Sequence, residues 1–173
     1  MKILVTILFT LYSLAGLAAT TSDKPNIILI VADHMGASDI GPYGATDIAT
    51  PALDALAKQG ARFTDFYGAA PVCGPSRAAM MTGQYPARIG FEDNIDHLGG
   101  LSADIPTLPA LLKQHGYRNG HFGKWPLGGA KDMDPLAHGF DESFGYHGWS
   151  VNYYTHRNDA GEEALMHNRS PVE

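Results

Sequence analysis

The chain has 173 residues, and its 12 Lys and Arg residues against 18 Asp and Glu residues give a formal net charge of −6 at pH 7. This acidic balance argues against nucleic-acid binding, and the 45% share of hydrophobic residues is that of an ordinary globular protein. It does not exclude an anionic substrate, because local arginine and lysine side chains matter more than the net charge.

The first 19 residues have the layout of a secretory signal peptide. Lys2 provides a basic start, residues 3–17 are mostly apolar, and the small residues Ala18 and Ala19 precede a polar stretch. The apolar run is shorter than the roughly 20 residues that span a bilayer. We therefore predict cleavage after Ala18 or Ala19, no stable membrane anchor, and a periplasmic or secreted protein whose mature part starts at residue 20.

The first predicted strand covers residues 27–32, an unbroken apolar run rich in β-branched side chains. Such a run is typical of a central strand covered on both faces, as in a parallel sheet. Asp33 and His34 follow directly, and ligand sites in open α/β sheets lie at the carboxyl ends of the strands. A carboxylate at position 33 could bind a metal, cap a helix or form an ion pair.

Proline, glycine and apolar spacing predict the next elements. Thr50 and Pro51 are typical of a helix start, and Gly60 and Gly116 are typical helix ends. In chain order, the predicted elements are a helix from Pro51 to the residue before Gly60, a strand over 62–67, a helix over 106–115 and a strand over 117–122. The chain after Trp125 is expected to be mostly loop. Strands that alternate with helices indicate an α/β layered architecture.

Cys73 is the single cysteine of the chain, and it lies in a loop rich in proline and glycine. In an exported protein cysteines usually occur in pairs, and one thiol cannot form an intrachain disulfide. Because a Pro/Gly-rich stretch beside Arg77 is not an apolar core, we expect a chemical role for Cys73. The stretch leads into a predicted helix, whose N-terminus favours anionic ligands and to which Arg77 adds a cation.

Several motifs, in order along the chain, resemble the sulfatase family. Residues 73–77 followed by Thr82-Gly83 match its Cys-x-Pro-Ser-Arg signature, and Lys124 in 120–128 matches the lysine of its Gly-Lys-Trp-His-Leu-Gly segment. Residues 138–146 are similar to another family stretch, which we interpret mainly as packing and turn residues. The resemblance runs from Pro25 to about Glu173, and implies an alkaline-phosphatase-like three-layer α/β/α sandwich with a mostly parallel central sheet, here truncated.

The resemblance also implies a chemistry. A formylglycine-generating enzyme would oxidise Cys73 to formylglycine, whose hydrate attacks a sulfate ester. Ca²⁺ or Mg²⁺ would be held by Asp33, His34 and the modified Cys73, while Arg77 and Lys124 would neutralise the sulfuryl oxygens. The expected substrate is a sulfated small molecule or a sulfated carbohydrate. Other side chains that could line a substrate cleft, or be structural, are His147, Tyr153, Tyr154 and His156.

Two positions depart from the family pattern. His34 replaces the second acidic residue of a metal-binding pair, and Pro126 replaces a histidine that faces the substrate.

Sulfatases of this kind are also much longer, so we expect residues 20–173 to be the N-terminal part of a catalytic domain, inactive alone. Three hypotheses stay open: a sulfatase active with its remainder, a catalytically inactive remnant, and a phosphoric-ester hydrolase on the same scaffold. Phosphoric-ester hydrolases of that scaffold generally use Thr or Ser as nucleophile, which Cys73 does not match.

Overall fold

The computed structural model describes residues 24–93 and 99–172, which fall into two compact units divided after Gly36. The predicted signal peptide, residues 1–19, lies outside the described residues. No helix in the described part of the chain is long and apolar enough to cross a membrane.

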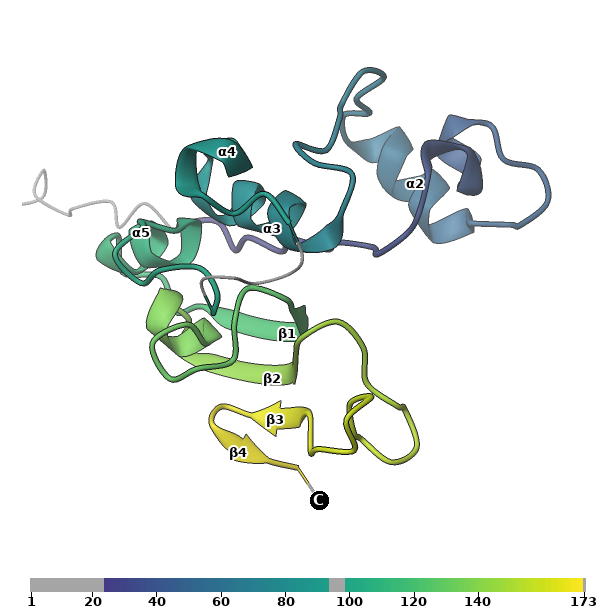
Figure 1. Cartoon of the computed structure of the whole chain (residues 1–173). Coiled ribbons are helices and arrows are strands. Elements are labelled where there is room, and N and C mark those ends of the chain that lie inside the picture. Colours follow the sequence, from purple (N-terminus) through teal and green to yellow (C-terminus); the bar gives the residue numbers. More distant parts are fainter. Residues whose placement is uncertain (1–23, 94–98, 173) are drawn as a thin grey trace, which may run out of the picture. The chain divides into compact units, whose positions relative to one another are not determined.

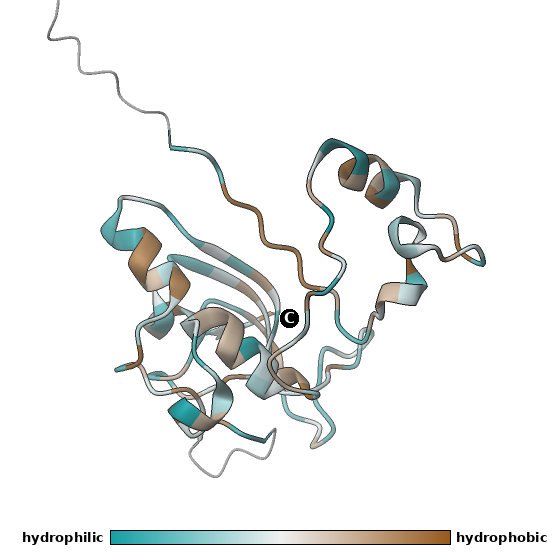
Figure 2. Ribbon diagram, turned by 90° about the horizontal axis from the view of Figure 1, so that it is seen from above, coloured by the Kyte–Doolittle hydropathy of each residue, from teal (hydrophilic) through white to brown (hydrophobic). Residues whose placement is uncertain are grey.

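The described part of the first unit, residues 24–36, is extended and forms neither helix nor strand. The strand predicted over 27–32 is therefore not present as a strand. Its apolar side chains are exposed, with 84% of Ile28 accessible, and the segment stands out as a brown stretch in Figure 2. A β-strand needs hydrogen bonds from a neighbouring strand, and within this unit the described residues provide none.

The second unit contains all the helices and strands described (Figure 1). Its helices are η2 (Ala37–Asp39), η3 (Gly41–Tyr43), α2 (Pro51–Gln59), α3 (Cys73–Thr82), α4 (Pro86–Ile89), α5 (Leu108–Gln114) and η4 (Pro135–His138). Its strands are β1 (Gly120–Trp125), β2 (Glu142–His147), β3 (Leu165–His167) and β4 (Ser170–Pro171).

The helix predictions are confirmed within a few residues, but several leucines on these helices are exposed. Helix α2 has the predicted bounds, yet Leu53 and Leu56 are exposed. Helix α5 is shorter than predicted, and Leu108 and Leu111 are also exposed. The spacing of leucines thus predicts the helices themselves, whereas burial of their apolar faces depends on packing partners.

The strands run in the order β1-β2-β3-β4 and form a mixed sheet. β1 and β2 are parallel, with Lys124 opposite Tyr146, and β2–β3 and β3–β4 are antiparallel. The prediction for 62–67 was wrong, since this segment is not a strand. The strand predicted at 117–122 starts three residues later, and β2 lies in a stretch that we expected to be turns and loop.

Two glycines, Gly123 in β1 and Gly145 in β2, allow the backbones of these strands to pack closely. Gly145 pairs with Gly123, and a Cβ built on Gly145 would lie 1.8 Å from the Gly123 carbonyl oxygen. Gly145 has no positive φ, so the turn role expected for it is wrong and close packing of the two backbones is the reason for glycine. Gly139 does have φ of +95°, as expected for a turn glycine.

The hydrophobic core of the second unit joins α3 to the end of β1. Its buried residues are Ala78, Phe91, Leu101, Trp125 and Leu127. Leu101 is 1% exposed and its N–H donates to the Leu127 carbonyl at 2.7 Å. This packing holds α3 against the segment that carries Lys124.

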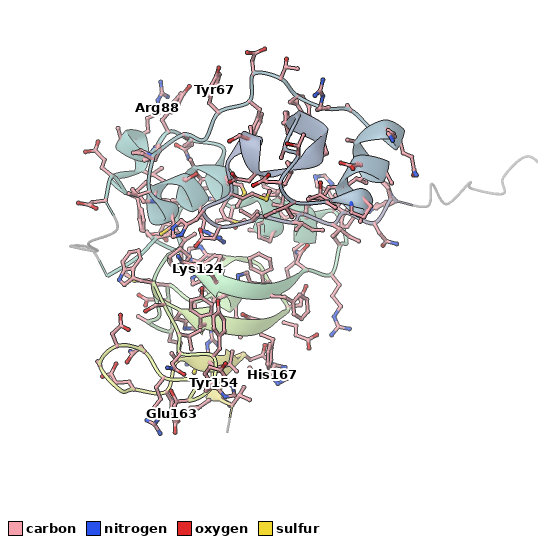
Figure 3. All side chains as sticks on the ribbon, turned by 90° about the vertical axis from the view of Figure 1, so that its right-hand side faces the viewer. Tyr67, Arg88, Lys124, Tyr154, Glu163 and His167 are labelled. Carbon is pink, nitrogen blue, oxygen red and sulfur yellow. The ribbon has the colours of Figure 1, made fainter. Side chains whose placement is uncertain are left out.

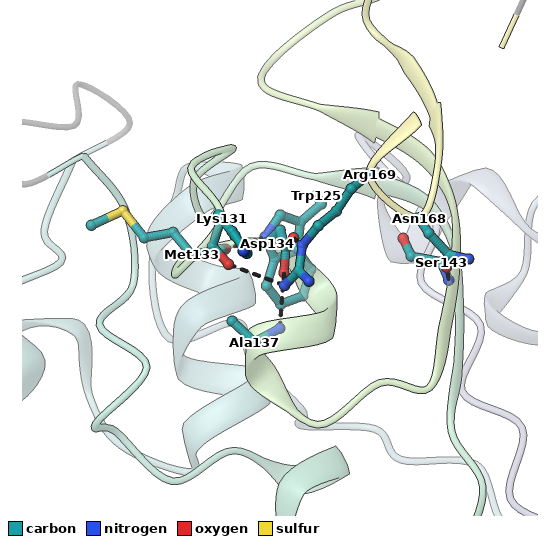
Figure 4. A network of polar contacts seen from close by, with 8 residues as sticks. All are labelled: Trp125, Lys131, Met133, Asp134, Ala137, Ser143, Asn168 and Arg169. Atoms are coloured by element: carbon teal, nitrogen blue, oxygen red, sulfur yellow. Dashed lines mark hydrogen bonds and ion pairs between the residues drawn. The ribbon is translucent and has the colours of Figure 1, made fainter. Parts of the chain in front are cut away.

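A network of polar contacts around Asp134 holds Trp125, the last residue of β1, in place (Figure 4). Asp134 is 1% exposed, accepts from the Ala137 N–H at 2.8 Å, and forms an ion pair with Arg169. The indole of Trp125 donates to the Met133 carbonyl at 2.9 Å. The network ties the β3–β4 turn and η4 to the tryptophan that ends β1.

Candidate active site

Cys73 is the first residue of α3 and is half-buried. Val72 precedes the helix in an extended conformation and contributes no side-chain cap. Pro75 fits the first turn because the N–H that it lacks is not needed there. The cysteine predicted in a loop thus lies at the N-terminal end of a helix, where the helix dipole favours a negative charge.

The rest of the signature has a structural explanation. Gly83 ends α3 with φ of +68°, and its N–H donates to the Ala79 carbonyl at 2.8 Å. The Thr82 hydroxyl donates to the Ala78 carbonyl at 2.8 Å. Thr82 and Gly83 therefore terminate the helix that presents Cys73, and a left-handed glycine at this position is the usual helix end.

Arg77 follows Cys73 by one helical turn, so the two side chains share a face of α3. Its Nη1 donates to the carbonyl oxygen of Lys124 at 3.3 Å, across 47 residues of sequence. Lys124 lies near the carboxyl end of β1 and is labelled in Figure 3. The structure therefore brings the backbone of Lys124 to α3, the helix that begins with Cys73 and carries Arg77.

His121 and His147 are histidines near this group that the motif comparison did not select. The ring of His121 lies 5.3 Å from that of Trp125, and its Nδ1 lies 3.1 Å from the Ser143 hydroxyl oxygen. Burial lowers the pKa of His121 to about 4, and the charges of His147 and Arg77 act in the same direction. Burial also lowers the pKa of His147. The alternation of β1 could have placed His121 on the Trp125 face, because they are four residues apart in a strand.

Pro126 is buried beside Trp125 and Leu127. A prolyl side chain provides no proton or hydrogen-bond donor, so the contribution of the family histidine at this position is absent from residue 126. Among the other histidines, His138 is 2% exposed and its Nε2 contacts the Leu101 carbonyl at 3.1 Å, which confirms its interpretation as a packing residue.

Asp33 and His34 belong to the first unit and are exposed. His34 has φ of 56°, a left-handed conformation that is uncommon outside glycine. Within residues 24–93 and 99–172, no three His, Cys, Asp or Glu side chains lie close enough to hold a metal ion. Hard cations take six to eight oxygen ligands, and this pair offers one carboxylate. The described residues therefore do not form a complete calcium or magnesium site.

Tyr153 and Tyr154 extend from the loop after β2 and are 84% and 95% exposed. The Asn152 side chain accepts from the N–H groups of Tyr154 and Thr155 at 2.9 and 3.0 Å, which orders the turn. His156 has φ of 57° in the same loop. The place of these residues in a substrate cleft stays a prediction.

The comparisons with known proteins agree with the motifs. The family model described as Sulfatase matches residues 25–166. N-acetylgalactosamine-6-sulfatase of Rattus norvegicus is 44% identical over 145 residues, covering 78% of this chain and 28% of the relative. Arylsulfatase A of Bos taurus is 45% identical over 141 residues, covering 79% and 27% respectively. The chain thus spans less than a third of the length of these relatives.

Solved structures show the same relationship. The crystal structure of Ps i-CgsB has a TM-score of 0.79 and 41% identity, covering 86% of this chain and 37% of that one. A structure solved with its substrate D-glucosamine-2-N,6-O-disulfate has a TM-score of 0.62 and 32% identity, covering 77% and 24%. The predicted alkaline-phosphatase-like α/β fold class is confirmed, although the sheet of this chain is mixed. The chain belongs to the sulfatase family.

Proposed function

We propose that this chain carries the nucleophile and part of the anion site of a sulfuric ester hydrolase. The observation that supports this most directly is the hydrogen bond from Arg77 to the Lys124 carbonyl, 3.3 Å long. It joins two signature segments that are far apart in sequence, on the helix that begins with Cys73. The family membership of the chain supports the same reaction class.

In this proposal a sulfatase-maturing enzyme oxidises Cys73 to formylglycine, and the mature protein is periplasmic or secreted. The hydrated aldehyde supplies one hydroxyl to attack sulfur and a second one to release the sulfate afterwards. The position of residue 73 at the start of α3 favours the negative charge that develops there. Arg77, on the same helical face, stabilises that charge at close range.

Lys124 and Arg77 would bind the sulfuryl oxygens as the ester bond breaks. Two fixed cations in a partly buried site stabilise the growing charge more than water does, because they need little reorganisation. With Pro126 in place of a histidine, the leaving oxygen takes its proton from another source. We therefore expect slower turnover for substrates with basic leaving groups than for aryl sulfates.

The metal is a separate part of the proposal. A divalent cation would add Lewis acidity at the nucleophile, with Asp33 as its best oxygen ligand in this chain. Because the described residues do not complete such a site, no step above depends on it. His34 would be a weak ligand for Ca²⁺ or Mg²⁺, since hard cations prefer oxygen.

The proposed substrate is a sulfated carbohydrate. Relatives include an enzyme named for N-acetylgalactosamine-6-sulfate and a structure whose bound substrate is a disulfated glucosamine. The exposed Tyr153 and Tyr154 are suited to stacking on sugar rings. A sulfated small molecule is the alternative substrate.

The first experiment is mass spectrometry of the native gene product, as the peptide that contains Cys73, combined with turnover of an aryl sulfate and of the matching aryl phosphate. Formylglycine at position 73, with sulfate released by the wild type but not by Cys73→Ala, would support the proposal. An unmodified thiol in a protein without turnover would instead support the inactive remnant. Preferential release of phosphate would support a phosphoric-ester hydrolase.

A further inference from the structure

Two histidines with buried ring nitrogens flank the segment that connects β1 to η4. His138 ends η4, is 2% exposed, and its ring lies 5.5 Å from that of Trp125. His147 ends β2 and lies opposite Trp125 in the parallel register. A Cβ built on Gly129 would be 3.4 Å from the Cβ of His147, so the connecting segment packs on this histidine. Both histidines therefore lie against Trp125 or the residues that follow it.

Each ring has a buried nitrogen without a hydrogen-bond partner among the described residues, Nδ1 in His138 and Nε2 in His147. A neutral imidazole has one acceptor nitrogen, whereas an imidazolium has two N–H donors. The Nε2 of His138 already contacts the Leu101 carbonyl at 3.1 Å, so in the charged form its Nδ1–H would be a buried donor without an acceptor. An unpaired buried donor on a cation costs far more than an unpaired neutral acceptor. The closed arrangement therefore favours neutral rings.

Asp134 is a carboxylate whose charge acts on both rings, and it is already paired. Its Oδ1 accepts from the Ala137 N–H at 2.8 Å and from Arg169 Nη2 at 3.1 Å, and its Oδ2 accepts from Arg169 Nε (Figure 4). The Asp134 charge raises the pKa of both histidines, but burial has the larger effect and lowers both below the ordinary 6.5. Arg169 thus leaves this carboxylate little capacity to neutralise a second cation.

The other titratable groups around the two rings are basic. The ring of His121 lies 5.3 Å from that of Trp125, and the charges of His121 and His147 oppose each other. Arg77 acts on His121 in the same direction. Because a like charge disfavours the charged form, each proton taken up by this group makes the next one more costly in the closed structure.

The connecting segment is held mainly at its two ends. Residues 129–132 are exposed, whereas the Met133 carbonyl accepts from the indole of Trp125 at 2.9 Å and Asp134 pairs with Arg169. Local opening of residues 128–138 therefore needs only these contacts and those of the two histidines to break, while the core residues Leu101 and Leu127 stay in place.

We propose that residues 128–138 form an acid-sensitive clasp, which stays closed while His138 and His147 are neutral and opens locally when they take up protons. In the open state water hydrates both imidazolium rings, whereas the closed state leaves ring N–H groups without acceptors. Opening would free the indole of Trp125, the residue that follows Lys124. The clasp goes beyond the proposed function and does not depend on it.

The test is amide hydrogen exchange of the native protein at pH 7.5 and pH 5.0, measured by mass spectrometry and expressed as protection factors, which correct for the effect of pH on the exchange chemistry. The N–H groups of Met133 and Ala137 donate to the Ala130 and Asp134 carbonyls, so peptides that cover 128–138 report the clasp. One histidine that is charged only in the open state favours opening by up to about 30-fold at pH 5.0, so we expect protection to fall by about tenfold or more. Helix α2 contains no histidine and is the internal reference, expected to change by less than about twofold.

Two variants remove the titration and keep the packing. His147→Phe retains a ring and removes the unpaired nitrogen, so protection at pH 7.5 should be kept and the fall at pH 5.0 reduced. His138→Gln retains a donor for the Leu101 carbonyl and has no charge at either pH. The double variant should lose no more than about twofold in protection between the two pH values. His115→Gln, which removes an exposed histidine, is the matched control and should keep the full wild-type fall.

Equal protection of 128–138 at both pH values in the wild type would overturn the inference. An equal fall in α2 would also overturn it, because acid would then destabilise the whole fold rather than the clasp. If one variant does not fold, the wild-type comparison and the other variant decide. An undiminished fall in the folded variants would assign the response to other groups and refute the role of the two histidines. No readout uses sulfate turnover, so the clasp and the proposed function can fail independently.

Discussion

Replacing Gly145 with alanine should separate β1 from β2 and disturb the site through the backbone alone. The added Cβ would lie 1.8 Å from the Gly123 carbonyl oxygen, 2.7 Å from its carbonyl carbon and 2.8 Å from its nitrogen. Ordinary contacts with a Cβ begin near 3.4 Å. The two strands would have to move apart by about 1.5 Å at this pair, and a hydrogen bond does not tolerate such a shift.

The expected cost follows from that displacement. Losing two ladder hydrogen bonds costs about 1 kcal/mol each, and leaving their buried groups unpaired costs more. Alanine recovers about 0.5–1 kcal/mol because it restricts the unfolded chain. We therefore expect a net loss of about 2–4 kcal/mol in the free energy of unfolding, at the upper end of the range for overpacking substitutions. The overlap dominates because its partner is backbone, which cannot rotate away.

The assay is urea unfolding of the native protein, followed by circular dichroism. Gly68→Ala is the matched control, because a Cβ there would meet its neighbours at 3.5 Å and Gly68 has no positive φ. We expect the control to unfold within about 0.5 kcal/mol of the wild type. Equal midpoints for Gly145→Ala and Gly68→Ala would show that β1 and β2 are not packed as described, and would refute the reasoning.

Three further predictions concern the core, pH and the ion pair. Leu101→Ala should lower the free energy of unfolding by about 2–5 kcal/mol, measured by urea unfolding, because the side chain is 1% exposed and leaves a cavity. His121 has a folded pKa of about 4 against 6.5 ordinarily, so the unfolded chain binds more protons between these values. Its contribution to stability is then complete above pH 6.5 and is lost as the pH falls toward 4; melting temperatures across this range should decline less in His121→Phe than in the wild type. Arg169→Met should lower the melting temperature, because it leaves the buried Asp134 carboxylate without its cation, and Asp134→Asn combined with it should recover part of the loss. Equal melting temperatures for wild type and Arg169→Met would show that the ion pair is not formed in solution.

Local patterns in the sequence were sufficient to predict the positions of the helices and to identify the cysteine signature. Pro51 and Gly60 predicted the bounds of α2, because proline suits a first turn and glycine suits a helix end. The Cys73 motif predicted a helix after the cysteine, and Thr82-Gly83 proved to be its termination. These features depend on residues within one or two turns of each other. The motifs were also specific enough to predict the sulfatase family from the residues alone.

Pairing between distant segments could not be read from the same patterns. The apolar run 27–32 has the composition of a buried strand but has no strand partner among the described residues of its unit. In contrast, β2, which contains Gly145, forms a strand because β1 provides hydrogen bonds for it. The glycine at 145 is required by Gly123, 22 residues away, and the hydrogen bond of Arg77 reaches Lys124, 47 residues away. Composition and periodicity determine which local structure a segment favours. Only tertiary contacts decide which segments pair, which distant carbonyl a side chain reaches, and where a glycine is required.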